Sequence, residues 1–257
     1  MDNILSAAIL GLMQGLTEFL PISSTAHLIL MQKLLEFKAP PHKIFEVIVQ
    51  IGSALAVLTV YWERLIFSLK GDRPFLAKIA VATVPAALIG FLFHSPIKTL
   101  LYNHITIGLS LILGGLFFLL IDRIKQHPSC NAPETIHPKQ ATLIGAAQAV
   151  ALIPGVSRSG ATIAAGVLVG MSASAATQFS FMLAIPTLLG AGCYELFSNW
   201  HAITAEHATT LSIGFLTSFV ASLLVFRPLV QGIDRYGFRP FGWYRIGLGI
   251  LLLLPDW

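Results

Sequence analysis

Two polar stretches, each interrupting a long apolar run, hold the side chains that could do chemistry. In the first stretch, Gln14 and Glu18 are four residues apart and therefore share one face of a helix. Ser24 and His27 follow Pro21 and are three apart, which makes them neighbours if that arm is also helical. A carboxylate inside an apolar run is costly to bury, so Glu18 is a candidate functional residue.

The Glu–Ser–His combination indicates acid–base or nucleophilic chemistry. His27 could serve as a general base or as a phosphate-accepting nucleophile, with the Glu18 carboxylate as its orienting group. The alternative is that Glu18 is a packing residue whose carboxylate bonds only to its helix neighbours. That alternative gives His27 no role.

The second stretch, Pro154–Thr162, is rich in glycines and hydroxyl side chains around Arg158. Small residues let backbone approach an anion, while hydroxyl groups and a forked guanidinium bind phosphate oxygens. A tight helix crossing would explain the small residues but not Arg158, which is expensive inside a membrane protein. Arg245 could reach the same cavity or extend its charge to the membrane surface. The residues that we expect to bind phosphate are Ser157, Arg158, Ser159, Gly160 and Thr162.

Composition places these stretches in a membrane. The 257 residues include only 16 Lys or Arg and 12 Asp or Glu, so 11% are charged while 55% are hydrophobic. A soluble domain carries about 25% charged residues, and the mean hydropathy here is +0.78. We therefore exclude a soluble enzyme, a nucleic-acid-binding protein and a disordered chain. We attribute the net charge of +4 to Lys and Arg residues that set the membrane topology, rather than to binding of a polyanion.

Apolar segments of bilayer-spanning length predict an all-α integral membrane protein. Barrel-like alternation is absent from the sequence. We expect six spanning helices, at Ile44–Trp62, Pro74–Phe93, Ile105–Ile121, Ala175–Tyr194, Thr209–Phe226 and Phe241–Leu254.

The two polar stretches predict re-entrant helix–turn–helix hairpins, at Ile4–Phe37 and Ala141–Met171, because each places proline and polar residues between short apolar arms. Each hairpin precedes three spans, so the chain is interpreted as a first repeat (1–125), a cytoplasmic linker (126–140) and a second repeat (141–257). Three spans is an odd number, which makes the second repeat inverted and points to a binding site between the halves.

Lys and Arg counts give an orientation. Loops 63–73, 122–140 and 227–240 hold more of these residues than loops 94–104 and 195–208. The positive-inside rule places the first three loops in the cytoplasm and both termini outside.

The two polar stretches resemble motifs of a known family, the undecaprenyl-diphosphate phosphatases or bacitracin-resistance proteins. The segment Gln14-Gly-Leu-Thr-Glu18-Phe-Leu-Pro21-Ile-Ser-Ser24-Thr-Ala-His27-Leu is similar to their first motif. Pro154-Gly-Val-Ser-Arg158-Ser-Gly-Ala-Thr162 is similar to their second. Phe45-Glu46 and Tyr244-Arg245 also resemble the family, whereas Gln14 stands where glutamate is more frequent.

The resemblance implies a bacterial inner-membrane enzyme that hydrolyses undecaprenyl diphosphate to undecaprenyl phosphate, recycles the lipid carrier of peptidoglycan synthesis and confers bacitracin resistance. It implies a divalent cation, Mg²⁺ or Ca²⁺, and a site open to the outer, periplasmic face. Carried over by position, Gln14 and Glu18 would hold the cation, and Ser24 or His27 would attack phosphorus. Ser23 and the second motif would bind substrate with Arg245 as a helper, and Arg158 would count among the catalytic residues.

Two other functions are weighed against this one. A lipid-phosphate transporter would also use inverted repeats and a phosphate site, but it would not need the Glu–Ser–His set. A non-catalytic scaffold would not need intramembrane Glu, His and Arg. The sequence does not decide whether Ser24, His27 or a water attacks, and it does not identify the interface of an expected homodimer.

Overall fold

The computed structural model describes residues 3–70, 73–124 and 128–254. In these ranges the protein is helical, and its only β-type pairing is an isolated bridge between Cys130 and Met171. The expected all-α class is therefore confirmed. The predicted boundary between residues 125 and 126, and the chain ends Met1 and Trp257, lie outside the described residues.

The first half of the chain is built from five main helices. Three short helical turns connect them: η1 (Pro41–Lys43), α5 (His94–Pro96) and the π-helical η2 (Ile97–Leu101). The main helices are α1 (Asn3–Thr17), α2 (Ser24–Leu34), α3 (Ile44–Lys70), α4 (Arg73–Leu92) and α6 (His104–Ile121).

The second half repeats this order of long and short helices. Its short turns are η3 (Pro133–Thr135), η4 (Trp200–Ala202) and η5 (Ala205–His207). Its main helices are α7 (Pro138–Val150), α8 (Arg158–Leu168), α9 (Ala173–Ser198), α10 (Ala208–Tyr236) and α11 (Arg239–Leu252).

Five helical segments in the described chain are long and apolar enough to cross a membrane: Ile44–Phe67, Pro74–Leu92, His104–Ile121, Ala173–Ser198 and Ala205–Phe226. The sixth expected span corresponds to α11, which has 14 residues. At 1.5 Å per residue such a helix is about 21 Å long, shorter than the hydrocarbon core of about 30 Å. The chain is a multi-pass membrane protein, and the count of six spans stays a prediction.

Two regions expected to be loops are largely helical. Helix α3 continues to Lys70 and α10 to Tyr236, so most of 63–73 and 227–240 extends the helices before them. The apolar run ends earlier than the helix because hydropathy reports lipid contact, whereas backbone hydrogen bonding continues into the polar region.

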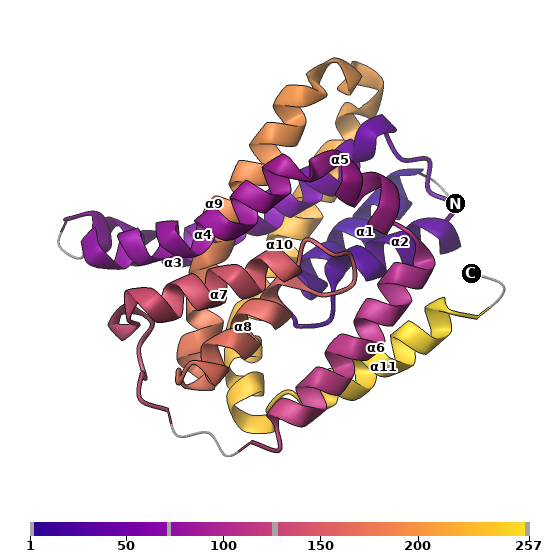
Figure 1. Ribbon diagram of the computed structural model, residues 1–257. Coiled ribbons are helices and arrows are strands. Elements are labelled where there is room, and N and C mark those ends of the chain that lie inside the picture. Colours follow the sequence, from indigo (N-terminus) through magenta and orange to yellow (C-terminus); the bar gives the residue numbers. More distant parts are fainter. Residues whose placement is uncertain (1–2, 71–72, 125–127, 255–257) are drawn as a thin grey trace.

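The halves are packed together element by element. Helix α1 lies against α10 and α7 lies against α4, while α3 packs on α9 and α6 packs on α11. Figure 1 shows α6 and α11 running side by side. Their backbones approach closely at glycines: a Cβ on Gly115 would lie 2.6 Å from the Gly242 carbonyl oxygen, and one on Gly249 would lie 2.6 Å from that of Gly108. Small residues at such crossings allow tight helix contact in membranes.

Two polar turns lie where these helices converge, at 18–23 between α1 and α2 and at 151–157 between α7 and α8. Aromatic rings pack behind the first turn. The centroid of the Phe19 ring is 5.3 Å from that of Phe181 and 4.8 Å from that of Phe226. These buried rings give the polar turns a rigid apolar support.

Candidate active site

Each polar turn ends in a serine with an unusual backbone conformation. Ser23 has φ 70° and Ser157 has φ 73°, a region that non-glycine residues rarely adopt. The Ser23 hydroxyl accepts from the Ala26 N–H at 3.4 Å, and the Ser157 hydroxyl accepts from the Gly160 N–H at 3.1 Å. The two serines thus cap α2 and α8, whose N-terminal ends carry partial positive charge that favours an anion.

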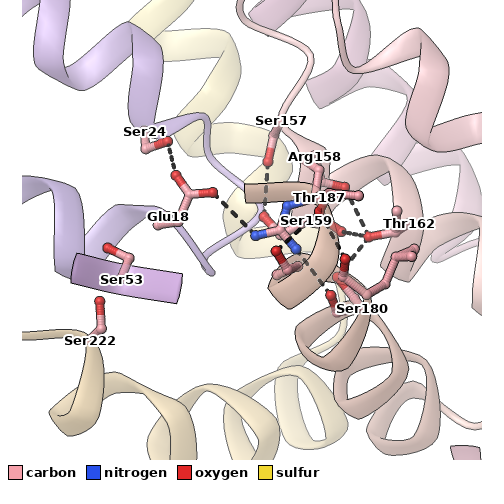
Figure 2. Close-up of polar contacts among 12 residues, drawn as sticks. Glu18, Ser24, Ser53, Ser157, Arg158, Ser159, Thr162, Ser180, Thr187 and Ser222 are labelled. Carbon is pink, nitrogen blue, oxygen red and sulfur yellow. Dashed lines mark hydrogen bonds and ion pairs between the residues drawn. The ribbon is translucent and has the colours of Figure 1, made fainter. Parts of the chain in front are cut away.

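The carboxylate of Glu18 joins the two turns. Its Oε2 accepts from the Gln14 side-chain amide at 2.9 Å and from the Ser24 hydroxyl at 2.6 Å. Its Oε1 accepts from Nη2 of Arg158 at 3.2 Å. Figure 2 shows Glu18 between Ser24 on one side and Arg158 on the other. The sequence prediction that these four residues meet is therefore matched by their geometry.

Arg158 is held in place by α9 and by its own helix. Its Nη1 donates to the carbonyl oxygen of Ser180 at 3.0 Å. Thr162 Oγ1 lies 2.9 Å from the Arg158 carbonyl oxygen, to which it donates, and 2.7 Å from the Ser180 hydroxyl. Nε of Arg158 is buried and has no hydrogen-bond partner within the described chain. A free guanidinium donor in this position could bind a phosphate oxygen.

Glu18 and Arg158 lie at the polar end of a cavity of about 630 Å³. The same end is lined by Ser23, Ser24, Gln148 and Ser157. Much of the remaining wall comes from α4, α9 and the second turn and is apolar, including Ala86, Leu152, Ile153, Pro186 and Leu188. This polar group therefore lies beside a largely apolar stretch of cavity wall.

A second polar group lines another part of this cavity. It consists of Lys43, Glu46, Tyr102 and Glu195. The Lys43 ammonium lies 3.3 Å from the centre of the Tyr102 ring, a cation–π contact. One Glu46 oxygen accepts from the Gln32 amide at 3.1 Å. Of these four residues, only Glu46 stood out in the sequence, in the pair Phe45-Glu46 that resembles the family.

Three residues expected to bind phosphate do not line the cavity. The Ser159 hydroxyl donates to the Leu20 carbonyl oxygen at 2.9 Å, and Thr162 is committed to Arg158 and Ser180. The Gly160 N–H donates to the capping hydroxyl of Ser157, and a Cβ at Gly160 would lie 2.9 Å from the Phe118 ring. In this arrangement they shape the second turn and fasten it to the first, because their polar groups are satisfied by protein.

Two further expected site residues do not line the cavity. His27 lies 2.8 Å from the Ser23 carbonyl oxygen through Nδ1 and 2.6 Å from the Tyr244 hydroxyl through Nε2. It is not among the cavity-lining residues. Arg245 is 0% exposed and bonds to backbone carbonyls, so its guanidinium does not extend to the membrane surface.

Sequence reasoning gave no role to Ser180 or Tyr244. A signal for Ser180 was available, since Phe179-Ser180 occupies in the second half the place that Phe45-Glu46 occupies in the first. Tyr244 stood next to Arg245 in a dipeptide already noted for its family resemblance, but nothing in its spacing pointed to His27.

Oxygen donors suited to a hard cation lie beside Glu18. The Gln14 Oε1 atom is buried and has no hydrogen-bond partner in the part of the chain described, and the same holds for Gln148 Oε1. Mg²⁺ and Ca²⁺ prefer oxygen ligands, and Mg²⁺ usually binds through one or two carboxylates together with substrate phosphates. The orphaned Gln14 oxygen and the Glu18 carboxylate therefore fit such an ion.

Comparison with known proteins gives a consistent result. Residues 7–251 match the family described as bacitracin resistance protein BacA. An undecaprenyl-diphosphatase of Acinetobacter baumannii is 41% identical over 99% of this chain and 97% of its own length. One from Parvibaculum lavamentivorans is 42% identical over 98% of this chain and 96% of its own. An undecaprenyl-diphosphatase 2 of Paramagnetospirillum magneticum is 40% identical over 97% of both chains.

Proposed function

The chain belongs to the bacitracin resistance protein BacA family, and from this premise we propose that it hydrolyses undecaprenyl diphosphate to undecaprenyl phosphate and inorganic phosphate. This reaction returns the lipid carrier to peptidoglycan synthesis and accounts for bacitracin resistance. The observation that carries the proposal is the Glu18 carboxylate, which bonds to both Ser24 and Arg158 in the wall of a largely apolar cavity.

The cavity suits an amphiphile. A prenyl diphosphate needs cationic and hydrogen-bonding groups for its head and an apolar path for its tail. Arg158, Ser23 and Ser157 supply the polar groups, and the walls from α4 and α9 supply the apolar path. The N-terminal ends of α2 and α8 add a favourable field for the diphosphate.

For the chemical step, Ser24 is the side chain best placed to attack. Its hydroxyl donates to Glu18 at 2.6 Å and lines the cavity. Glu18 would accept the Ser24 proton as Oγ bonds to the terminal phosphorus and the bridging P–O bond breaks, releasing undecaprenyl phosphate. Arg158 would stabilise the charge on the transferring phosphoryl oxygens. Glu18 would pass that proton to the departing undecaprenyl phosphate and so regain its charge. It would then take a proton from a water molecule that attacks the phosphoserine, and return it to the Ser24 oxygen as inorganic phosphate leaves.

We also propose that the enzyme uses Mg²⁺ or Ca²⁺. The Glu18 carboxylate and the Gln14 amide oxygen would hold the ion, with the substrate's phosphates as further ligands. When bound, the cation would neutralise phosphate charge. The Gln14 amide also donates to Glu18 at 2.9 Å, which orients the carboxylate both for binding the cation and for accepting the Ser24 proton.

The architecture we propose is a pair of inverted repeats with two re-entrant hairpins. The swapped packing of α1 on α10 and α7 on α4, together with α3 on α9 and α6 on α11, supports it. One constant sequence separation also relates several residues of the first half to counterparts in the second. These pairs are Gln14 and Gln148, Ser23 and Ser157, Phe45 and Phe179, Gly108 and Gly242, and Gly115 and Gly249.

The proposed location is the bacterial inner membrane, with the cavity open to the periplasmic face. The excess of Lys and Arg in loops 63–73, 122–140 and 227–240 supports a cytoplasmic position for those ends. A homodimer stays a prediction.

Phosphate release from a prenyl diphosphate by the purified, detergent-solubilised protein tests the function. We expect turnover by the wild-type chain and only background release by Ser24→Ala and Glu18→Gln. Binding of the prenyl diphosphate without release of phosphate by the wild-type protein would instead favour a transporter.

A further inference from the structure

Arg245 occupies an unusual position for a charged side chain. It is 0% exposed and is the largest fully buried side chain in the described protein. It is not among the residues lining the cavity. No carboxylate of the described chain pairs with it. An arginine buried in a membrane protein is costly and is retained for a function. Since Arg245 does not reach the cavity, that function must act through its neighbours.

Those neighbours are the backbones of both polar turns and of α6. Nη1 donates to the Pro21 carbonyl oxygen of the first turn at 3.1 Å and to the Val156 carbonyl oxygen of the second turn at 2.9 Å. Nη2 donates to the Gly155 carbonyl oxygen at 3.0 Å and to the Ser110 carbonyl oxygen of α6 at 3.2 Å. One planar guanidinium thus connects three segments that are distant in sequence.

The three turn carbonyls, those of Pro21, Gly155 and Val156, need a partner because they belong to non-helical backbone. A carbonyl left bare at membrane depth costs several kcal/mol, and a turn cannot satisfy it as a helix would. The guanidinium supplies five N–H donors in a rigid fork, which an ammonium group does not. Arg245 therefore both satisfies the turns and fixes their relative position.

The guanidinium is closely surrounded by α6. A Cβ on Gly114 of α6 would overlap Nη2 of Arg245 and would lie 2.7 Å from its central carbon. The Phe118 ring closes another side, with its centre 5.1 Å from the same carbon. Gly114 is thus the residue whose lack of a side chain admits the guanidinium.

We propose that Arg245 is a positioning residue for the hydrolytic reaction: by binding the carbonyls of both turns, it sets the approach of Glu18 to Arg158. Glu18 precedes Pro21 by three residues, and Arg158 follows Val156 by two, so a shift of one turn against the other changes their 3.2 Å contact. The proposal rests on the proposed function, and it replaces direct phosphate binding as the role of Arg245.

The test compares kcat with ligand binding. For Arg245→Ala we expect kcat to fall by about 10²-fold, the size of effect that misplaced catalytic groups produce. Arg245→Lys should retain an intermediate rate. The dissociation constant for a prenyl methylenediphosphonate, a non-hydrolysable analogue, should stay near that of wild type in both. Each variant is assayed well below its own melting temperature. Analogue binding that weakens in step with kcat would overturn the proposal in favour of direct phosphate contact, and so would a wild-type kcat.

Gly114→Ala provides an independent variant that displaces Arg245 without removing it. We expect it to lower kcat in the wild-type background and to cost nothing more in Arg245→Ala, where the space is free. Added guanidinium ion should restore part of the rate of Arg245→Ala but not of the double variant, whose Cβ fills that space.

Matched controls on the same helix are Gly247→Ala, whose Cβ would meet nothing within 4 Å, and Arg239→Lys, whose side chain is exposed. Both should keep the wild-type rate. Full additivity of Gly114→Ala and Arg245→Ala would contradict the proposal. If the wild-type protein itself releases no phosphate, the proposed function fails, which is a separate outcome.

Discussion

The hydroxyl of Tyr244 lies 2.6 Å from Nε2 of His27, with the two rings parallel to within 1°. The other ring nitrogen, Nδ1, faces the Ser23 carbonyl oxygen at 2.8 Å, and a carbonyl can only accept. In the neutral ring Nδ1 therefore carries the proton, and Nε2 accepts from Tyr244. His27 is thus tied to α11 and does not line the cavity.

From this pair we predict that Tyr244→Phe destabilises the protein. The change leaves Nε2 of His27, a residue only 4% exposed, without its donor, at a cost of about 1–3 kcal/mol. Denaturant unfolding in detergent measures it, with the exposed Tyr236→Phe as control. The loss should vanish in a His27→Ala background. Equal losses with and without His27 would show that the pair is not coupled.

Glu18→Gln should lower kcat by about 10²–10⁴-fold, the usual contribution of a positioned acid–base group. The amide keeps the shape of the carboxylate but cannot accept the Ser24 proton. Phosphate release and melting temperature are measured together, and Glu63→Gln at an exposed position of α3 is the control. A Glu18→Gln enzyme with a near-normal rate would rule out the carboxylate as base.

Arg158→Lys should keep about a tenth of the activity or less, because losing one charge-assisted hydrogen bond costs roughly 1.5–3 kcal/mol. An ammonium cannot reproduce a fork that bonds Glu18 and Ser180 and leaves Nε free for phosphate. Arg158→Ala should lose nearly all activity. If both variants lose melting temperature in proportion to rate, the effect is structural and the phosphate-clamp role is wrong.

The cation requirement is tested with EDTA, which should reduce phosphate release to background until Mg²⁺ or Ca²⁺ is restored. Gln14→Glu adds a second carboxylate beside Glu18 and should lower the cation concentration that gives half-maximal rate, since carboxylates bind hard cations more strongly than amides. Gln231→Glu, exposed on α10, controls for added charge. Activity that persists unchanged in EDTA would argue against a cation.

Membrane orientation is best tested at Ser129, because the neighbouring cysteine in the expected linker, Cys130, is buried. Cys130 is only 5% exposed, and its sulfur lies 3.1 Å from the Thr135 hydroxyl, so it is a poor labelling site. We predict that, in a cysteine-free background, Ser129→Cys resists an impermeant maleimide in intact cells, whereas His201→Cys reacts. The reverse pattern would invert the proposed topology.

The sequence predicted five of the six expected spans to within five residues at each end, because hydropathy reports contact with lipid directly, and the sixth span stays a prediction. The expected span Pro74–Phe93 differs from the membrane-spanning segment Pro74–Leu92 by one residue. The meeting of Glu18, Ser24 and Arg158 was also predictable, because related motifs in two halves point to one site between them. The partners of Arg245 were not, since all four of its closest acceptors are backbone carbonyls and carry no side-chain signature. The contact of His27 with Tyr244 was not predictable for another reason, since its side-chain partner is 217 residues away on the last helix.

The matching caps at Ser23 and Ser157 have an evolutionary consequence. They share a backbone conformation, yet the next residue is Ser24 in one turn and Arg158 in the other. Two identical half-length chains, paired in opposite orientations, would carry the same residue after both caps and could offer two hydroxyls or two guanidiniums, never one of each. Joining the halves in a single gene frees each copy to diverge. In the inverted-repeat architecture that we propose, the proposed nucleophile Ser24 and the proposed anion clamp Arg158 can then face one another across a pseudo-symmetric centre.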